Sequence, residues 1–413
     1  MKPGLLLMQQ GGLLAVVLFT LFVALLPLTE AVHIVPLLLI IGSLLLWRQL
    51  SCFEAVKHYI MVALLMTLPV AFAAIGAYDV ERTLIDAVRI GLYFYAGMVL
   101  LKMNPEPLSL RLSDILFYLI LIISLSWSLD AILQYLTGRN LLGFEYNNHR
   151  VTGVFYPKMR IGIVLAHLLP FSIEACRRLS IRWFSGHWVW LLLIPILFVI
   201  FIGGSRSSWM VAALAILGYM MFFVWQGTLS IRNVAVGCVL VLATGVLSYQ
   251  FVPQFQQRVD STAQLFEMTE DSLNAATSMR GDVWRAAWTL FKESPVNGIG
   301  QGAMADMIEE QHLAKRGYPH AHFFGLDVLM YAGIIGFVAY IAAFALLLRR
   351  VWHAACAKRC GDFALTLAAM LMSMPINTHW GIYSTLSSSI MCMLIILSFL
   401  RTQDAALDKD VAV

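Results

Sequence analysis

Apolar segments near the length needed to cross a lipid bilayer recur along the whole sequence. Hydrophobic residues make up 60% of the chain and charged residues only 13%, whereas a soluble domain carries about 25% charged residues. A transmembrane helix needs roughly 20 mostly apolar residues. We therefore predict an all-α polytopic membrane protein, a single integral membrane domain over residues 1–413. Its twelve predicted spans are 12–29, 32–47, 59–77, 89–101, 115–136, 161–175, 187–203, 207–225, 234–250, 323–347, 363–379 and 383–400.

The distribution of basic residues predicts how the chain is oriented. An even number of spans puts both termini on one side, and more than half of the 28 Lys and Arg residues fall in loops on that side. The positive-inside rule then makes both termini cytoplasmic. Residues 251–322 become one long periplasmic loop between the ninth and tenth spans, with helical stretches expected at 253–266, 279–292 and 304–313. A loop of this length in a compact protein is usually functional.

Several cations lie on the outer side, against the topological preference. Arg206 sits in the tight hairpin Gly203-Gly-Ser-Arg-Ser-Ser-Trp209, and the short loop 138–160 contains Arg150, Lys158 and Arg160. Such a concentration of outer charge indicates an anionic ligand at the outer leaflet. For the three residues of the short loop, attraction of anionic membrane lipids explains the charge equally well. The net charge of +4 is too small and too scattered for a nucleic-acid partner.

Two histidines precede the tenth predicted span. The sequence Pro319-His-Ala-His322 ends the long polar loop, and an apolar helix is expected to begin directly after it. The imidazoles would then lie beside the free N–H groups and the positive dipole end of that helix. An ordinary pKa near 6.5 suits a histidine to accept a proton at neutral pH. Capping of the helix is the alternative role for His322.

The second helical stretch of the long loop has an arginine and tryptophan face. Arg280, Trp284 and Trp288 recur at helical spacing and share one side, while Asp282 and Arg285 are able to pair on another. The tryptophans are expected either to pack this helix onto the membrane surface or to stack on a sugar ring. Arg280 opens the helix and points the same way as Trp284.

Four short motifs, in order along the chain, resemble one known family. They are Arg150-Val-Thr-Gly-Val-Phe155, Gly204-Ser-Arg-Ser207, the Arg280 and Trp284 helix followed by Pro295-Val-Asn-Gly-Ile-Gly300, and His322 followed by Gly333-Ile-Ile-Gly336. Together they resemble the O-antigen ligase and polymerase superfamily of bacterial cell-envelope enzymes, over about 138–340. The sequence departs from the family pattern at Phe323, where the family usually has Asn.

The resemblance implies a GT-C-like membrane glycosyltransferase in the bacterial inner membrane, with its active site facing the periplasm. The donor would be an undecaprenyl-diphosphate-linked glycan and the acceptor a lipid A–core oligosaccharide, with inversion at the sugar. On this reading His322, Arg206 and Arg280 are catalytic. The substrate-binding residues are Arg150, Lys158, Arg160, Trp284, Arg285 and His320.

No metal and no other cofactor is expected. Many related membrane glycosyltransferases hold a divalent ion with acidic residues in the first outer loop. Here Glu30 is the only acidic residue of that loop, and no Asp-x-Asp follows it. Magnesium or manganese would require more carboxylate oxygens than this.

Three alternative functions remain open at the level of sequence. An O-antigen polymerase and a protein O-oligosaccharyltransferase share the superfamily and differ in the acceptor. A twelve-span transporter or flippase belongs to another class, and it would call for symmetric halves and polar groups near the bilayer midplane. Asp130, inside the fifth span, is compatible with either a paired structural carboxylate or a site residue.

Overall fold

The computed structural model describes residues 3–28, 56–146, 150–182, 187–232, 280–314 and 317–403, with isolated positions between 34 and 41 and between 234 and 260. These residues are overwhelmingly helical, and among them β-pairing is limited to two isolated bridges. The predicted spans 32–47 and 234–250 and the predicted stretch 253–266 lie mostly outside the described residues.

Every other predicted span coincides with described helices. Four of the described helices are long and apolar enough to cross a membrane: α4 (Val80–Met103), α5 (Leu110–Thr137), α8 (Arg206–Gln226) and α14 (Phe324–Cys356). The remaining positions are occupied by α1 (Pro3–Leu25), α3 (Lys57–Phe72), α6 (Ile161–Arg182), α7 (Leu193–Ile202), α15 (Cys360–Met372) and α16 (Thr385–Phe399). The all-helical, multi-pass prediction agrees with this arrangement, while the total of twelve spans stays a prediction.

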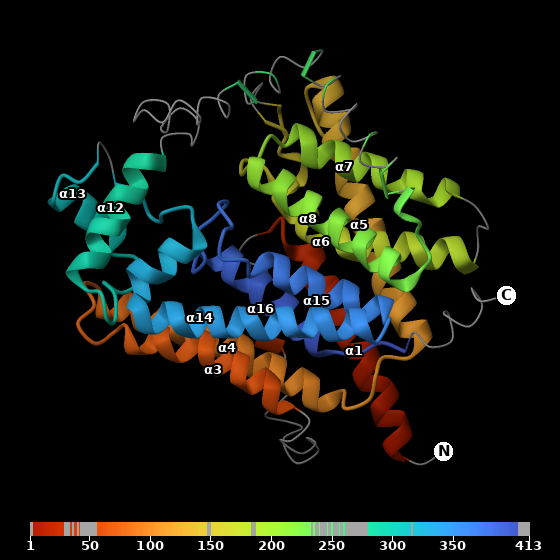
Figure 1. The fold of residues 1–413 in the computed structure, drawn as a ribbon, viewed down its shortest axis with the longest axis horizontal. Coiled ribbons are helices and arrows are strands. Elements are labelled where there is room, and N and C mark those ends of the chain that lie inside the picture. Colours follow the sequence, from red (N-terminus) through yellow and green to blue (C-terminus); the bar gives the residue numbers. More distant parts are fainter. Residues whose placement is uncertain are drawn as a thin grey trace.

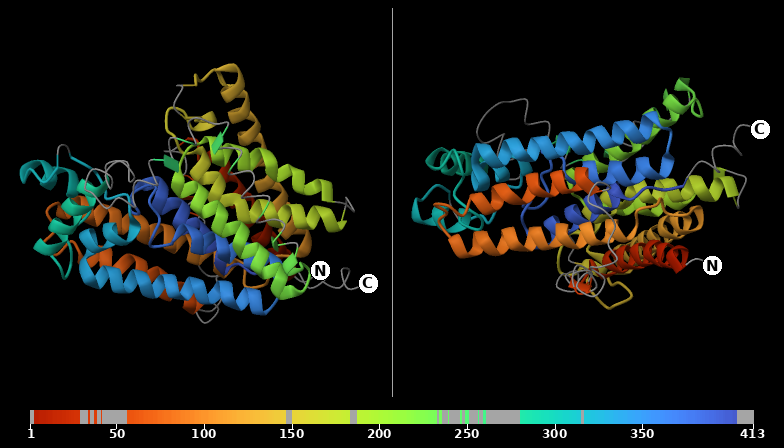
Figure 2. Two further views of the ribbon diagram at one scale, coloured as in Figure 1. Left: turned by 45° about the horizontal axis from the view of Figure 1, so that its top comes forward. Right: turned by 90° about the horizontal axis from the view of Figure 1, so that it is seen from below.

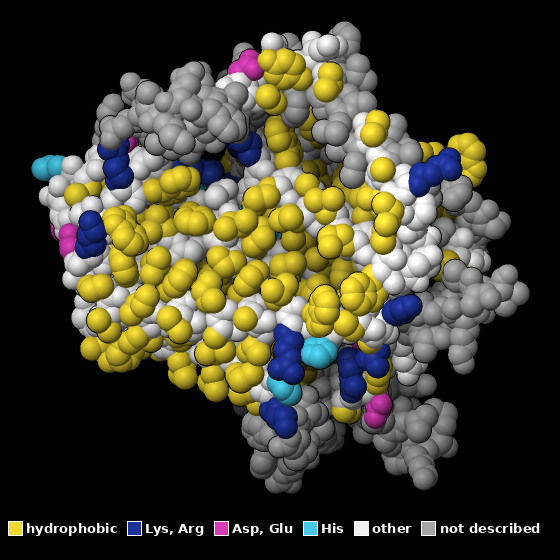
Figure 3. All heavy atoms as spheres, in the orientation of Figure 1, with side chains coloured by type: hydrophobic (Ala, Val, Ile, Leu, Met, Phe, Trp, Pro, Cys, Tyr) yellow, Lys and Arg dark blue, Asp and Glu magenta, His cyan; other side chains and the backbone are white. Residues whose placement is uncertain are grey.

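The helices form two groups that meet at α15 and α6. One group contains α3, α4, α14, α15 and α16, which run side by side, and the other contains α5, α6, α7 and α8 (Figures 1 and 2). Helices α6, α15 and α16 are buried along almost their whole length. On the face shown in Figure 3, hydrophobic side chains cover the middle of the long helices, and Lys and Arg lie toward their ends. This distribution is typical of helices surrounded by lipid.

A buried ionic network joins α5 to α6. The guanidinium of Arg178, which is fully buried, donates to Glu174 at 2.7 Å and to Asp114 of α5 at 2.8 Å. Arg177 and Arg182 add further ion pairs to the same two carboxylates. Charges this deeply buried are tolerated only when they are paired, so the network fixes the relative positions of α5 and α6.

Two helices of the predicted periplasmic loop pack at the N-terminal end of α14. They are α12 (Arg280–Glu293) and α13 (Met304–Glu310), drawn in teal in Figure 1. Their apolar faces form a second small core with the first turns of α14, built from residues such as Val283, Leu290, Met304, Ile308 and Met330. The helical character expected for 279–292 and 304–313 is therefore observed in the described part of the loop.

Helix α14 is interrupted at Gly333, and a turn from the loop is inserted there. Gly333 has φ 62° and ψ −165°, which no α-helix contains. The backbone amide of Ile334 donates to the Pro295 carbonyl at 2.9 Å, and that of Gly300 donates to the Tyr331 carbonyl at 3.1 Å. The inserted turn thus satisfies backbone groups that the break leaves without helical partners. Two motifs of the sequence, Pro295–Gly300 and Gly333–Gly336, are one structural unit.

Candidate functional site

The loop that carries the two histidines is held at both ends and in its middle. The backbone amide of Ala321 donates to Asp327 Oδ1 at 2.7 Å, and the Trp284 indole donates to the Ala321 carbonyl at 3.0 Å. The Tyr331 hydroxyl donates to the Pro319 carbonyl at 2.6 Å. Asp327 and Tyr331 belong to the first turns of α14, and Trp284 belongs to α12. Two helices therefore fix the peptide between the histidines.

His322 adopts a backbone conformation that is rare outside glycine. Its φ is 55°, in the left-handed region, which only a few per cent of residues other than glycine occupy. Such strain persists only where surrounding contacts enforce it, and it concentrates at functional sites. Here it turns the His322 ring against the His320 ring, with 4.1 Å between their centroids.

The hydrogen bond of the His322 ring defines its tautomer. Nδ1 lies 2.9 Å from the backbone carbonyl oxygen of His379. A carbonyl oxygen only accepts, so Nδ1 carries the proton and Nε2 presents a lone pair. Burial and the positive charge of Arg280 lower the pKa of His322 below its ordinary value, against the opposing effect of the His379 carbonyl. The ring is therefore neutral at pH 7, with Nε2 able to accept a proton.

His320 has a more enclosed environment. Burial, followed by the charges on His322 and Arg280, lowers its pKa to about 3. A Cβ added to Gly381 would stand 2.8 Å from the Cγ of His320, so only glycine at position 381 leaves room for this ring. His320 thus stays neutral and packs against His322, and its supporting role stays a prediction.

Three arginines from separate segments lie close to one another, and one of them, Arg280, also lies close to the histidines. Arg280 is the first residue of α12, Arg206 is the first residue of α8, and Arg150 lies in the loop before α6. Burial lowers the pKa of Arg280 most, and the charges of Arg206 and Arg150 lower it further. A cation at a helix N-terminus also opposes the helix dipole. Guanidinium groups held close together favour an anionic ligand, because each presents a planar fork that matches two oxygens. Binding of such a ligand by these arginines stays a prediction.

The Arg150 segment is anchored by a buried amide of α5. Gln134 accepts hydrogen bonds from the backbone amides of Thr152 at 3.0 Å and Gly153 at 2.8 Å. Four residues earlier, Asp130 accepts from the Asn140 side chain and from the Leu141 amide. Both oxygens of Asp130 therefore help to position the turn after α5, which favours the structural one of the two roles that its sequence position allowed.

Comparison with known families concerns the region that contains most of this cluster. Residues 191–341, which include Arg206, Arg280, His320 and His322, match the family model described as O-Antigen ligase. This segment of the chain is similar to the O-antigen ligase family. No curated protein matches it significantly. The resemblance deduced from the four motifs is confirmed, and the chain is a membrane enzyme of the O-antigen ligase and polymerase type.

The other residues predicted to bind substrate differ in their exposure and in their partners within the protein. Arg160 lies 5.8 Å from the Trp380 ring, in the loop that supports His322, and burial lowers its pKa. Trp284 uses its indole N–H within the protein and packs on Phe323, 5.9 Å between centroids. Lys158 is exposed. Arg285 is 59% exposed and pairs with Asp282 at 2.6 Å. Sugar or lipid contact by these four residues stays a prediction.

Sequence reasoning missed the loop between α15 and α16. His379 supplies the carbonyl that orients His322, Gly381 makes room for His320, and Arg89 of α4 donates to the Tyr383 carbonyl at 2.6 Å to hold the loop in place. The polar sequence Asn377-Thr-His-Trp-Gly381 between two short apolar segments could have indicated this loop. The predicted spans 363–379 and 383–400 left almost no loop between them, whereas α15 ends at Met372 and α16 begins at Thr385.

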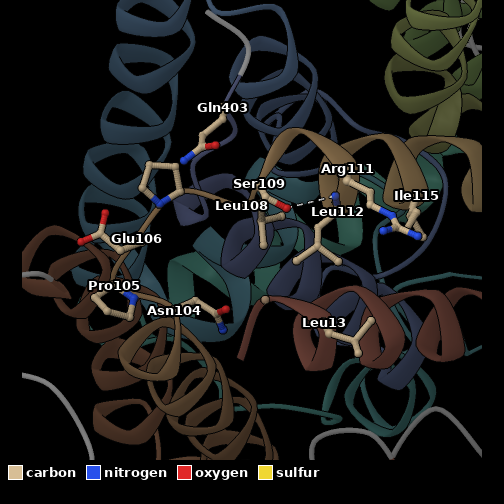
Figure 4. Close-up of a pocket in the computed structure, with 12 residues that line it drawn as sticks. Leu13, Asn104, Pro105, Glu106, Leu108, Ser109, Arg111, Leu112, Ile115 and Gln403 are labelled. Carbon is tan, nitrogen blue, oxygen red and sulfur yellow. Dashed lines mark hydrogen bonds between the residues drawn. The ribbon is translucent and has the colours of Figure 1, made fainter. Parts of the chain in front are cut away.

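A cavity of about 610 Å³ lies away from the histidines, at the other end of the helices. It is lined by Gly12 and Leu13 of α1, by the 104–109 connection with the first turns of α5, and by Gln403 (Figure 4). The Ser109 hydroxyl caps α5 there by accepting from the Leu112 amide. None of the predicted site residues lines this cavity.

Proposed function

We propose that this protein transfers an O-antigen glycan from undecaprenyl diphosphate to a lipid A–core oligosaccharide, by a single inverting displacement without a metal ion. The observation that carries the proposal is the His322 ring, with Nδ1–H held by the His379 carbonyl and Nε2 left as an acceptor beside three arginines. A neutral base next to an anion receptor is what transfer from a sugar diphosphate requires.

In the proposed reaction His322 acts as the general base. Nε2 removes the proton from an acceptor hydroxyl while that oxygen forms a bond to the anomeric carbon. The bond between the anomeric carbon and the diphosphate oxygen breaks, and the electron pair leaves with the diphosphate. The imidazolium that results keeps its Nδ1–H on the His379 carbonyl. Attack opposite the leaving group inverts the anomeric centre.

Arg206, Arg280 and Arg150 would bind the diphosphate and stabilise the charge that grows on it. Each guanidinium is permanently charged and presents a planar fork that matches two phosphate oxygens. Their mutual repulsion in the free protein is relieved when the dianionic leaving group binds. Because the donor carries its own leaving group, the reaction needs no nucleotide.

The proposed orientation puts this cluster on the periplasmic side of the bacterial inner membrane, with both termini cytoplasmic. It rests on the basic residues of the predicted inner loops. Labelling of a single cysteine at Ser272 in a cysteine-free protein tests the orientation. Labelling that requires permeabilisation of the inner membrane would contradict it, and the mechanism with it.

Transfer from purified lipid-linked glycan to core lipid by the purified protein is the direct test. The expected product is core lipid bearing the glycan, formed equally well with EDTA present. Loss of turnover with EDTA, restored by magnesium or manganese, would refute the metal-independent step. Extension of a lipid-linked glycan instead of core would identify a polymerase, and glycan on Ser or Thr would identify a protein O-oligosaccharyltransferase. Movement of donor across vesicles without transfer would identify a flippase.

A further inference from the structure

An apolar groove runs along the membrane part of the protein at the end of α14 that is remote from the histidines. It has a volume of about 910 Å³ and is lined by residues of α8, α14 and α15. Helix α14 begins at Phe324, beside His322, is interrupted at Gly333, and lines the groove from Ala345 to Cys356. At 1.5 Å per residue, the part of α14 between Phe324 and Ala345 is roughly 30 Å long, so the groove and the candidate active site lie toward opposite membrane surfaces.

The side chains that line the groove differ between its two ends. Trp225 and Trp352 lie in the last turns of α8 and α14, in edge-to-face contact with 5.6 Å between centroids, and both are more than half exposed. Exposed tryptophans of this kind mark the headgroup level of a bilayer. From there the lining becomes entirely aliphatic, aromatic or Met and reaches Leu214 and Met374.

The depth of the groove matches one leaflet. Leu214 and Trp225 bound it on α8 and are separated by about 17 Å of helix. Half of a hydrocarbon core roughly 30 Å thick is about 15 Å. Its occupant therefore has a long hydrocarbon portion that begins at the headgroup level and ends near the bilayer centre.

One cation stands at the headgroup end of the groove. Arg349 lines it and is exposed, and its Nε donates to His353 Nε2 at 3.2 Å. Within the described part of the chain, the terminal nitrogens of Arg349 have no carboxylate partner. The Lys358 carbonyl accepts from Gln226 at the end of α8, which brings a second basic residue close to the same end. A guanidinium at headgroup depth, at the end of an apolar groove, is complementary to a phosphate joined to acyl chains.

We propose that this groove binds an anionic phospholipid of the leaflet opposite the histidine loop. One acyl chain would lie between α8 and α14 against Leu217, Met221 and Leu367, and the phosphate would contact Arg349. The site is separate from the diphosphate receptor at the other surface. It makes the stability of the α8, α14 and α15 contact depend on lipid composition.

Lipid exchange on the full-length purified protein tests the proposal without any glycan transfer. The protein is equilibrated in nanodiscs containing phosphatidylglycerol and phosphatidylethanolamine, and the lipids retained per chain are counted by native mass spectrometry. We expect retention of phosphatidylglycerol over phosphatidylethanolamine. Arg349→Gln should lower apparent affinity for phosphatidylglycerol about fivefold and remove the preference. Met221→Trp, which fills the groove from an exposed position, should lower retention of both lipids.

Arg111→Gln is the matched control, because Arg111 is exposed, lines the separate cavity of Figure 4 instead of the groove, and undergoes the same change of charge. It should leave the preference unchanged. Equal retention of the two lipids by the wild type would overturn the proposal, as would an Arg111→Gln effect equal to that of Arg349→Gln. If the wild type is a dimer and Met221→Trp makes it a monomer without changing the lipid count, the groove binds a second copy of the chain. That result would refute lipid binding.

Discussion

The carboxylate of Asp327 holds the backbone amide of Ala321 at 2.7 Å, across the first turn of α14. Its second oxygen accepts from the Ile382 amide at 3.4 Å, in the loop that orients His322. One buried side chain therefore links the peptide between the two histidines to the loop behind them. The relative position of His322 and its carbonyl partner at 379 depends on this carboxylate.

Asp327→Ala should destabilise the protein and slow transfer. The substitution leaves the Ala321 amide buried without an acceptor, which typically costs about 1–3 kcal/mol. Asp327→Asn retains an oxygen for that amide and should keep more of both properties. Thermal unfolding in detergent and initial transfer rates measure the two effects. Asp306→Ala, at an exposed position on α13, is the control and should have little effect. If Asp327→Ala has as little effect, the hydrogen bonds of Asp327 do not hold the histidine loop in place.

The two histidines should respond differently to removal. Loss of a general base typically lowers the rate ~10²–10⁴-fold, so His322→Ala should abolish measurable ligation at normal protein abundance. His320→Ala should leave measurable activity, because His320 packs behind the base with its Nε2 buried. Initial rates on lipid-linked donor and core acceptor decide between them. The reverse ranking would move the base to His320, and two mild effects would leave the arginines as the main contributors.

Arg206→Lys separates bidentate binding from simple charge attraction. Lysine keeps the positive charge and loses the planar fork. Removal of a donor that stabilises the transition state typically lowers the rate ~10²–10³-fold, and we expect a loss in this range in kcat. Near-normal ligation by Arg206→Lys, at normal protein abundance, would assign Arg206 to a structural or lipid-facing role.

The pH dependence of transfer should report the environment of His322. Burial and the charge of Arg280 lower its pKa below the ordinary value, so the basic form is lost only as the pH falls through that lowered pKa. Arg280→Gln removes a positive charge and should raise the pKa, moving the acid limb of kcat/KM toward higher pH in whatever activity remains. Arg285→Gln, on the same helix but exposed and paired with Asp282, should leave the limb in place. A limb unmoved by Arg280→Gln would argue that His322 is not the titrating base.

Sequence alone was sufficient for the helices and for part of the candidate site. Long apolar runs such as 115–136 and 207–225 define helices directly, because backbone groups in hydrocarbon must be satisfied within the segment. The order of the arginine and histidine motifs also anticipated a cluster that the structure brings together from α8, α12 and the loops before α6 and α14. That cluster has the composition expected of the site, and its catalytic role stays a prediction.

The contacts that position the histidines could not be predicted, because they join segments that are far apart in the sequence. The carbonyl at His379 is 57 residues from the ring that it orients, and no local pattern indicates which backbone oxygen a histidine will find. The insertion of Pro295–Gly300 into the break at Gly333 could not be predicted from local sequence either. Its glycines predict turns, but the partner of such a turn depends on the packing of α12 against α14.

Gly298 provides the sharpest test of that insertion. It has φ 75°, and a Cβ there would collide with the backbone of Tyr331 and Ala332, which cannot move without displacing α14. Gly298→Ala should therefore lower the yield of folded protein severely and remove transfer activity. Gly138→Ala is the matched control, since Gly138 has φ 82° at the end of α5 with nothing within 4 Å of its Cβ position. It should cost only about 1 kcal/mol, the usual penalty for a left-handed alanine. Equal folding of the two variants, measured by monodispersity and thermal unfolding, would mean that the turn does not insert into α14 as described.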